Sequence, residues 1–445
     1  MGRTKRLRTQ RQRLALEQQQ TKDERFLPDL YKYLSTLGWN NETKLTARNF
    51  PLTGRGLCSK SVAIEKEAEI IRLPIDALLS IKTIENDEDF KNMFNVEQFD
   101  KDHKIPFQSL MAFYVMHQKL LAAESNFNSY IKSLPTYFTT PYFCPVSELQ
   151  CLPDSILERT VEQNRKIKES FQNLKLVYKY QDFDLKYTLN DFRWSYFVVN
   201  TRSVYIFGKQ IKPDNCFFQP LIAEDCNLAL APFLDLFNHS DQFTTQADLI
   251  RNPQTKQFEF ILTLENCPAE KILPLKQIFI SYGALTNLKL LVEYGFILPG
   301  NQNDFFEITL NDVETFLQQE KSFVGLMFHK NKFKFIREHN LHDQMFVHRE
   351  EGISHNLHVV LHLLFKEESP FPNILNQVAF GSEDNLLTVD AEVELLLRFK
   401  IKEYEKFVAT LESKQNLTKS GLVCKVYLQE CLEYLNTCLI NLQSS

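Results

Sequence analysis

The chain is 445 residues long, with 44% hydrophobic and 24% charged residues, which is the profile of a soluble globular protein with room for two or three domains. Its formal net charge of −5 gives no bulk electrostatic reason to expect nucleic-acid binding. No apolar run approaches the roughly 18–20 residues that a membrane helix needs, and no signal-peptide core follows Met1. We therefore expect no membrane partner.

The amino terminus differs from the rest of the chain in charge. Its first 13 residues, MGRTKRLRTQRQR, carry six basic residues and no acid. Residues 1–24 have little to bury, so we expect a basic disordered tail. Such a cluster is typical of a nuclear import signal or of a contact with an acidic partner, and a merely solubilising tail is the alternative.

Nine cysteines are scattered along the chain without a CxxC pair. Cys424, Cys431 and Cys438 recur every seven residues, which predicts one stripe of small buried hydrophobes on a helix rather than a metal or redox site. This usage indicates a reducing compartment, the cytosol or the nucleus.

The periodicity of apolar residues predicts elements that change in kind along the chain. FLPDLYKYLSTLG predicts a helix over residues 25–37 that ends at Gly38. Residues 51–74 hold two short apolar stretches around a Gly-rich turn, which predicts a β-hairpin-like start. Residues 105 to about 198 contain two stretches of helical periodicity, FQSLMAFYVMHQKLLAAE and SILERTVEQNRKIKESFQNL, separated by a loop punctuated with prolines.

Strands are predicted again after this helical part. DFRWSYFVVNTRSVYIF passes from a helical phase to a β-branched and aromatic run, and FEFILTL and QIFISYG are short, β-rich and bounded by turn residues. After residue 299 the pattern is mostly helical to the end of the chain. The predicted fold class is therefore α+β, in the order β, helical insertion, β, helical lobe, and the 37 phenylalanines predict a large aromatic core.

Four short stretches stand out, although each alone is more often structural than functional. The glycines of TGRG let a backbone approach a ligand closely, but any tight hairpin turn also favours them. In NTRSVY, Arg202 is flanked by apolar residues, and a buried arginine must be paired or must bind an anion. APFLDLFNHS places Asp235, Asn238 and His239 at and beside an apolar surface.

The fourth stretch, FISYGALTNLKLLVEYGF, has Tyr282 and Tyr294 each directly before a glycine. A tyrosine after a strand places a hydroxyl at the edge of an apolar pocket, where it can donate and accept hydrogen bonds.

In this order, GxG, NTRSVY, D-x-x-N-H-S, S-Y-G and E-Y-G-F resemble the SET-domain protein lysine methyltransferases, and most closely their Rubisco-large-subunit-methyltransferase-like branch. The resemblance covers roughly residues 25–300, and beyond them it depends on helical character. It implies a mainly β SET catalytic domain over residues 25–298, split by a helical insertion at about 100–198. An all-α, substrate-binding-like lobe is implied over residues 299–445.

The resemblance implies S-adenosyl-L-methionine as the cofactor and no metal. In relatives the GxG turn holds the methionine part of the cofactor, and the Asn-His pair holds its adenine side largely through backbone groups. Arg202 matches an arginine near both the cofactor carboxylate and the substrate. The cofactor-binding residues implied in this way are Thr53, Gly54, Arg55, Gly56, Arg202, Asn238, His239 and Tyr282.

The resemblance also implies a substrate side. Asp235 matches a carboxylate near the substrate, Tyr282 matches the catalytic pocket tyrosine near the transferring methyl group, and Tyr294 matches a second tyrosine of the lysine channel. The implied activity is transfer of a methyl group from S-adenosyl-L-methionine to a lysine side chain. An apolar, aromatic channel would lower the pKa of the lysine and keep the attacking amine neutral.

Three features depart from the family pattern or compete with it. Residues 241–281 contain no tyrosine, although relatives often carry one there, which leaves mono-, di- or trimethylation open. No Cys-rich segment follows the SET motifs, so the zinc site of many histone-specific relatives is not expected. His358 and His362 are spaced as in a zinc helix, but the Glu of HExxH is missing, and a polar edge of a lobe helix is expected instead.

Two other functions remain open on the sequence. One is a non-catalytic SET-fold module that binds a protein tail, which would bind no S-adenosyl-L-methionine. The other is a metallohydrolase with Asp235 and His239 as ligands, which needs a third ligand at similar depth. The expected partner is a histone or non-histone protein with an accessible lysine. We expect the chain to be a monomer located in the nucleus and cytoplasm. No nucleic-acid contact is expected beyond the basic tail.

Overall fold

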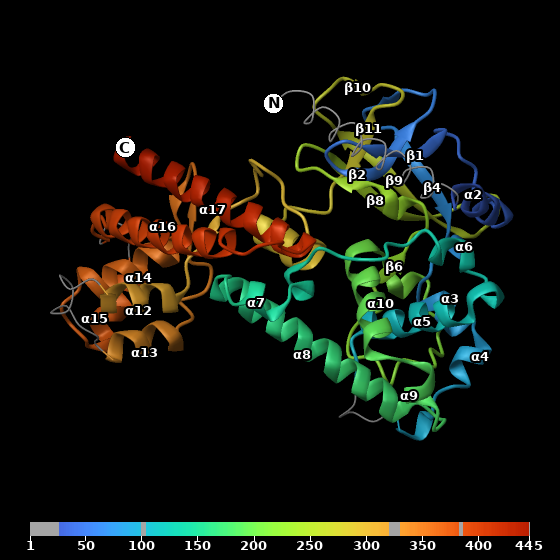
Figure 1. Ribbon diagram of the computed structural model, residues 1–445, viewed down its shortest axis with the longest axis horizontal. Coiled ribbons are helices and arrows are strands. Elements are labelled where there is room, and N and C mark those ends of the chain that lie inside the picture. The colour runs from blue at the N-terminus through green and yellow to red at the C-terminus, as the bar shows by residue number, and fades with distance from the viewer. Residues whose placement is uncertain (1–25, 99–103, 320–329, 382–385, 445) are drawn as a thin grey trace. The chain divides into compact units, whose positions relative to one another are not determined.

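The computed structural model describes residues 26–98, 104–319, 330–381 and 386–444, so the predicted basic tail lies outside the described residues. The chain divides into two compact units (Figure 1). The first unit contains the residues up to 138 and residues 161–284, and the second contains residues 139–160 and 285–445. The sequence predicts a boundary at residue 298, whereas contacts assign residues 285–298 to the second unit.

A four-stranded sheet of the first unit joins segments that are far apart in the sequence. Its order is β1–β2–β11–β7, with β1 antiparallel to β2, β2 antiparallel to β11, and β11 parallel to β7. The strands are β1 (Leu45–Phe50), β2 (Gly54–Ser59), β11 (Gln277–Ile280) and β7 (Asn238–His239). This pairing brings the predicted TGRG, Asn-His and S-Y-G motifs to one sheet.

The predicted hairpin within residues 51–74 is wrong. The first apolar stretch, β2, pairs with the preceding strand β1, and the second, β4 (Glu69–Pro74), pairs with β9 (Phe258–Asn266). β9 in turn pairs with β8 (Thr244–Arg251), so it is the central strand of a second sheet. Period-2 patterning identifies a strand but not its partner, because any strand of matching length can bury the same face.

Two short ribbons complete the strands of the first unit. They pair β3 (Ile64–Glu65) with β10 (Lys271–Ile272), and β5 (Ser203–Tyr205) with β6 (Leu228–Leu230). The predicted passage from helix to strand in NTRSVY is confirmed, because helix α10 ends at Arg202 and β5 begins at the next residue.

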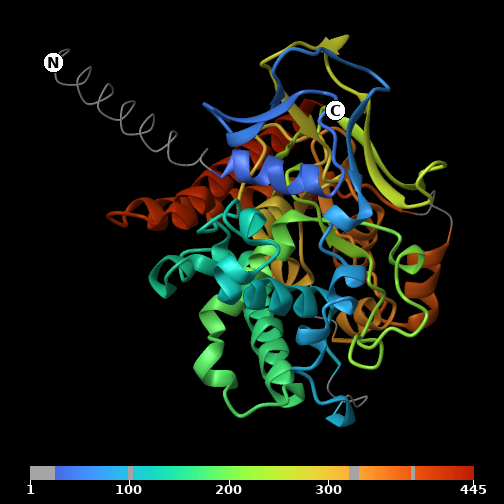
Figure 2. The ribbon, with the colours of Figure 1, turned by 90° about the vertical axis from the view of Figure 1, so that its right-hand side faces the viewer.

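Most helices of the first unit lie on one side of its two larger sheets, with β6 among them, whereas α2 (Leu27–Thr36) lies beside β4 (Figures 1 and 2). The other helices of this unit are α3 (Ile81–Glu85), α4 (Glu88–Lys91), α5 (Phe107–Leu121), α6 (Asn128–Ile131), α9 (Phe183–Lys186) and α10 (Leu189–Arg202). α8 (Asp154–Val177) belongs partly to each unit. The predicted aromatic core is confirmed: the ring of Phe113 lies 4.9 Å from that of Tyr187, and Phe94 lies 5.0 Å from Phe218.

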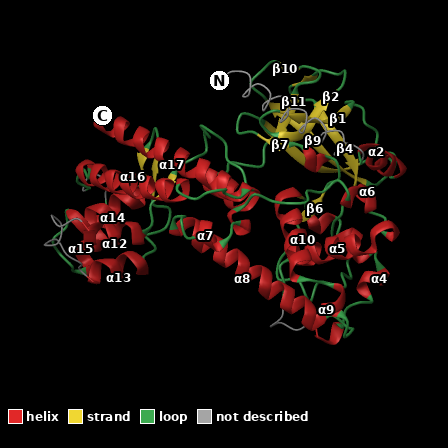
Figure 3. Cartoon of the chain, in the orientation of Figure 1, coloured by secondary structure: helices red, strands yellow, loops and turns green. Residues whose placement is uncertain are grey.

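The second unit is mainly helical (Figure 3). Its helices are α7 (Val146–Leu149), α11 (Asn287–Lys289), α12 (Leu310–Gln319), α13 (Lys330–Glu338), α14 (His355–Phe365), α15 (Pro372–Phe380), α16 (Asp390–Glu412) and α17 (Lys419–Ser444). It also contains a small sheet that the all-α expectation missed, made of β12 (Phe306–Glu307), β13 (Phe346–His348) and β14 (Gly352–Ile353). These strands are too short to give a periodic signal.

The cysteine stripe lies on α17, as predicted. Cys424, Cys431 and Cys438 are all buried, in the hydrophobic core of the second unit. In the part of the chain that the structure describes, no helix combines the length and the apolar character needed to cross a bilayer.

Candidate cofactor and substrate site

The GxG turn is tied to the strands beside it by two side-chain amides. Asn238 Nδ2 donates to the carbonyl oxygen of Arg55 at 3.0 Å, and the hydroxyl of Thr53 donates to Oε1 of Gln277 at 2.8 Å. The turn and the Asn-His segment are therefore held in one fixed arrangement at the ends of β2, β7 and β11.

Gly56 leaves space that these two amides occupy. A Cβ at Gly56 would lie 2.6 Å from Gln277 Nε2 and 2.8 Å from Asn238 Nδ2, well inside van der Waals contact. The sequence did not single out Gln277, because a polar residue before an apolar strand is common. Among the described residues its buried Nε2 has no acceptor.

Arg202 ends α10, and the predicted need for a partner is confirmed. Its Nη1 donates to the backbone carbonyl of Asp235 at 2.6 Å and lies 3.4 Å from the carboxylate oxygen Oδ2. Its side chain is 18% exposed, and its buried Nε has no acceptor within the described residues. Arg202 therefore keeps a donor that a bound carboxylate could use.

The side chain of Asp235 is only 1% exposed. The hydroxyl of Tyr130 donates to its Oδ2 at 3.0 Å, whereas Oδ1 is buried without a donor in the described structure. Burial raises the pKa of this carboxyl, and the nearby Arg202 and Tyr130 oppose that rise. Its predicted contact with substrate stays a prediction, and it requires a substrate group that reaches this depth.

The backbone of the APFLDLFNHS motif is strained at one residue. Phe233 is a non-glycine residue with φ 75° and ψ −43°, a conformation that costs on the order of 1–3 kcal/mol. The fully buried ring of Phe233 packs against Tyr31 and Trp39 at centroid distances of 5.1 and 5.0 Å. This packing holds the sharp bend from which the 3-10 turn Leu234–Leu236 leads into β7. The apolar residues of APFLDLFNHS thus position the polar ones.

His239 is buried, and its ring stacks on that of Tyr282 with centroids 5.0 Å apart. Its Nδ1 accepts the backbone N–H of Tyr282 at 3.1 Å. Burial lowers the pKa of His239, so the neutral ring is favoured. These contacts fix the His239 ring and Tyr282 relative to each other.

The hydroxyl of Tyr282 donates to the backbone carbonyl of Phe237 at 2.6 Å. Tyr282 lies two residues after β11, and Phe237 directly precedes β7, so this hydrogen bond links the segment that follows one strand to the start of its parallel neighbour. The phenol oxygen retains lone pairs with which it can accept a further hydrogen bond.

Tyr294 belongs to the second unit, where it ends the π-helix Leu290–Tyr294. π-helical turns are rare and occur frequently at functional sites. Burial raises the pKa of Tyr294, and its ring lies edge-on to Phe296 at 6.1 Å. The next residue, Gly295, has φ +77°, and a Cβ there would lie 2.6 Å from the backbone nitrogen of Thr140.

A buried asparagine that the sequence did not single out organises the segment before Tyr294. Asn287 is 2% exposed, donates through Nδ2 to the carbonyl of Leu298 and to Asp304, and accepts the N–H of Leu298. Every polar group of its side chain is therefore used to close the loop around Tyr294.

The predicted site residues divide between the units. Within the first unit, hydrogen bonds, ring stacking and strand pairing connect Thr53, Gly54, Arg55, Gly56, Arg202, Asp235, Asn238, His239 and Tyr282 to one sheet and its adjoining turns. Tyr294 is organised separately by the second unit. The individual ligand contacts assigned by the resemblance stay predictions.

The two helically spaced histidines make structural contacts. His358 Nε2 lies 3.0 Å from the carbonyl of Leu387, and His362 Nδ1 accepts the N–H of the same residue at 3.1 Å. Across the described ranges, no group of three or more His, Cys, Asp or Glu side chains is placed to hold a metal ion.

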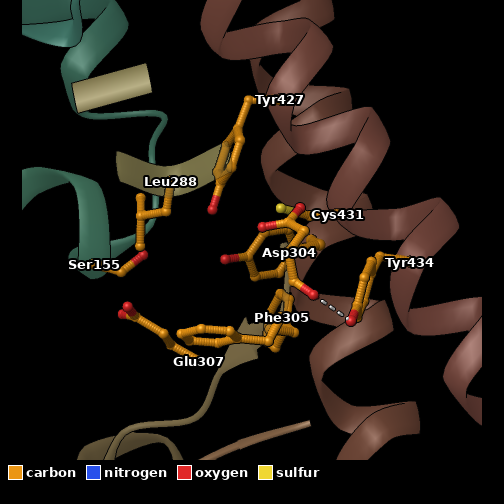
Figure 4. A pocket seen from close by; sticks show the side chains of 10 residues that line it. Ser155, Leu288, Asp304, Phe305, Glu307, Tyr427, Cys431 and Tyr434 are labelled. Atoms are coloured by element: carbon orange, nitrogen blue, oxygen red, sulfur yellow. Dashed lines mark hydrogen bonds between the residues drawn. The ribbon is translucent and has the colours of Figure 1, made fainter. Parts of the chain in front are cut away.

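A small cavity of about 20 Å³ lies within the second unit (Figure 4). Its lining includes Asp304, Glu307 and the three tyrosines Tyr404, Tyr427 and Tyr434. This volume suits about one water molecule. The charges at its wall are already compensated, because Asp304 accepts from Asn287 and Glu307 pairs with Arg159 at 2.7 Å.

Comparison with known proteins supports the motif-based resemblance. No protein-family model matches the chain. It is 26% identical over 409 residues to SET domain-containing protein 4 of Artemia parthenogenetica, covering 92% of this chain and 96% of that protein. The mouse protein of the same name is 28% identical over 284 residues, covering 62% of this chain and 60% of its own length.

Solved structures share the fold. The SET domain of LSMT bound to lysine and AdoHcy matches with a TM-score of 0.62 at 18% identity, over 94% of this chain and 91% of that one. Rubisco LSMT bound to AdoMet matches with a TM-score of 0.59 at 17% identity, over 94% and 93%. The predicted resemblance is confirmed: the chain has the SET fold of Rubisco LSMT, with a helical C-terminal region, and is similar in sequence to SET domain-containing protein 4.

Proposed function

We propose that the chain is an S-adenosyl-L-methionine-dependent protein-lysine N-methyltransferase. One observation carries the proposal: hydrogen bonds link the GxG turn to Asn238, and strand pairing joins this array to His239 and Tyr282. The same fold is found in LSMT structures bound to AdoMet, AdoHcy and lysine.

The residues present fit this cofactor. At Gly56 the missing side chain leaves the amides of Gln277 and Asn238 close to the backbone of the turn. Buried donors on Arg202 and Gln277 have no acceptor among the described residues, and a carboxylate-bearing ligand supplies acceptors. Thr53–Gly56, Arg202, Asn238, His239 and Tyr282 would hold it.

When bound, S-adenosyl-L-methionine supplies a methyl group on a sulfonium, which a lysine amine takes by in-line displacement. The side chains of this site act by positioning, which is the main requirement of such a displacement. Tyr282 is fixed by its bond to Phe237, so its oxygen can accept a hydrogen bond from the amine or from a polarised C–H group. Aromatic surroundings favour the neutral, nucleophilic amine.

The substrate and its location belong to the same proposal. The substrate is a protein with an accessible lysine, either a histone tail or a non-histone protein. The chain works as a monomer in the nucleus and cytoplasm, and the six basic residues of its first 13 positions support nuclear import.

Transfer of labelled methyl groups to cell extract tests the function directly. Wild type is compared with Tyr282→Phe and with Tyr180→Phe, a control on an exposed tyrosine of the first unit. We expect Tyr282→Phe to lose on the order of 10²-fold in rate and the control to match wild type. Equal labelling by all three would overturn the role of Tyr282, and no calorimetric heat with millimolar-range cofactor would overturn the function and favour a non-catalytic module.

A further inference from the structure

The helical insertion reaches the site through one short segment, α6 and the residues after it. The hydroxyl of Tyr130 donates to Asp235 Oδ2 at 3.0 Å. Three residues later, the backbone carbonyl of Ser133 accepts Nη2 of Arg55 at 2.8 Å. The segment therefore contacts both the GxG turn and the Arg202–Asp235 pair.

This segment is buried and is tied to α10 just after those contacts. Tyr130 and Ser133 are 0% and 1% exposed, and the hydroxyl of Ser133 donates to the carbonyl of Tyr130 at 2.7 Å. Trp194 Nε1 donates to the carbonyl of Pro135 at 2.8 Å, which ties the segment to α10, the helix that ends at Arg202. A buried segment that is anchored to a helix can hold its partners to a fixed geometry.

Tyr130 is the nearer donor to the carboxylate of Asp235. Arg202 lies 3.4 Å from Oδ2, whereas its 2.6 Å bond goes to the backbone carbonyl of the same residue. Without the phenol, the buried carboxylate would keep only the long contact with Arg202. It would then compete with the carbonyl for the guanidinium, because a buried charge without a hydrogen bond is costly.

We infer that Tyr130 is a positioning residue of the proposed methyl-transfer site: it holds the Asp235 carboxylate so that Arg202 stays on the backbone carbonyl with Nε directed to a ligand. This inference rests on the proposed function and assigns the helical insertion a part in the geometry of the site. Tyr130 acts through Asp235 and Arg202 and touches no reacting atom.

The chain offers a matched control. Tyr114 is 2% exposed, lies in the same unit, and its hydroxyl donates to a carboxylate oxygen, Asp87 Oδ2, at the same 3.0 Å. Tyr130→Phe and Tyr114→Phe therefore remove the same chemical group from equivalent burial and the same type of bond. Asp87 keeps donors from Phe90 and Gln118, so we expect Tyr114→Phe to lose no more unfolding free energy than Tyr130→Phe.

Only Tyr130→Phe should change the cofactor site. We expect the Kd and KM for S-adenosyl-L-methionine to rise about tenfold or more, the factor that a hydrogen bond to a charged group provides, with a smaller change in kcat. The charged and titratable groups facing Asp235 are Arg202 from α10, Arg55 from β2 and Tyr130 from α6. Loss of the phenol should therefore move the acid limb of kcat/KM to higher pH in this variant alone.

The outcomes separate this inference from the proposed function. If wild type binds cofactor and transfers methyl groups while Tyr130→Phe matches Tyr114→Phe in Kd, KM and pH profile, the positioning role is overturned and the function stands. If calorimetry finds no cofactor binding by wild type, the proposed function and the inference both fall. A tenfold rise in the Kd and KM for S-adenosyl-L-methionine in Tyr130→Phe alone supports both.

Discussion

The backbone N–H of Tyr282 donates to Nδ1 of His239 at 3.1 Å, and the two rings stack 5.0 Å apart. An amide N–H can only donate, so Nδ1 accepts it when the neutral ring carries its proton on Nε2; Nδ1 also lies 3.3 Å from the carbonyl oxygen of Ile280, to which the protonated ring would donate instead. Protonation of Nδ1 would break this bond. The predicted cofactor-side histidine and the predicted catalytic tyrosine are therefore linked through the protonation state of His239.

This link predicts a pH-dependent stability. Burial lowers the pKa of His239 in the folded chain, so below the ordinary value of about 6.5 the unfolded chain binds a proton that the folded chain resists. The free energy of unfolding is fully retained above that value and falls as pH decreases through it. We expect denaturant unfolding between about pH 8 and pH 5 to show this loss.

His239→Gln isolates the contribution, because glutamine keeps an acceptor oxygen and does not titrate. Burial also lowers the pKa of His117 and His362, so part of the slope remains in the variant. The variant should lose less unfolding free energy on acidification than wild type. Identical slopes for the two proteins would contradict this account.

Gly56→Ala should weaken cofactor binding more than it weakens the fold. The new Cβ would collide with the amide ends of Gln277 and Asn238, and side-chain ends can move, so we expect a stability loss of about 1 kcal/mol or less. The displaced Asn238 would lose its bond to Arg55, and we expect the calorimetric Kd for S-adenosyl-L-methionine to rise about tenfold.

A second variant checks the cause of that loss. Gln277→Ala in the Gly56→Ala background removes the closest collision, at 2.6 Å, so part of the collision strain should be relieved. The coupling between the two changes should then be favourable in a double-mutant cycle of unfolding free energy. Unchanged cofactor affinity in Gly56→Ala would show that the space at Gly56 is not used to bind the cofactor.

Asn287→Ala should destabilise the second unit strongly. It removes three hydrogen bonds of the Asn287 side chain, leaving the N–H and carbonyl of Leu298 and an oxygen of Asp304 without these partners. Each buried polar group left without a hydrogen-bond partner costs about 1–3 kcal/mol, so we expect the free energy of unfolding in urea to fall by about 3 kcal/mol or more. Asn436→Ala, an exposed asparagine on α17, should change stability by no more than about 0.5 kcal/mol.

Local patterns predicted the elements better than their partners. The periodicity of α5 and α8 and the β-rich runs of β9 and β11 are read from neighbouring residues, and the structure confirms them. The pairing of β4 with β9 depends on residues far along the chain, which no local pattern encodes. The three strands of the second unit gave no signal for a different reason, because they are too short to show a periodicity.

The site shows the same division. The motifs identified Arg202 and Asp235, but nothing in the sequence of YIKSLP indicated that Tyr130 would donate to that carboxylate from the insertion. Gln277 likewise acquires its place only when β11 pairs with β2 and brings it to Thr53. Residues that position others are recognisable only after long-range packing is known.

The last prediction concerns the glycine after Tyr294. Gly295 and Gly300 both have positive φ, +77° and +67°, and both lie in the second unit. A Cβ at Gly300 meets nothing within 4 Å, so Gly300→Ala should cost about 1–2 kcal/mol for the left-handed backbone alone. A Cβ at Gly295 would lie 2.6–2.7 Å from Thr140 and Thr139, largely from their backbone atoms, which cannot move aside as a side-chain end can. Gly295→Ala should therefore be less stable than Gly300→Ala by about 1–3 kcal/mol, the typical cost of overpacking, in matched urea unfolding. Equal losses would mean that backbone conformation alone, and not the close passage of residues 139–140, requires glycine in E-Y-G-F.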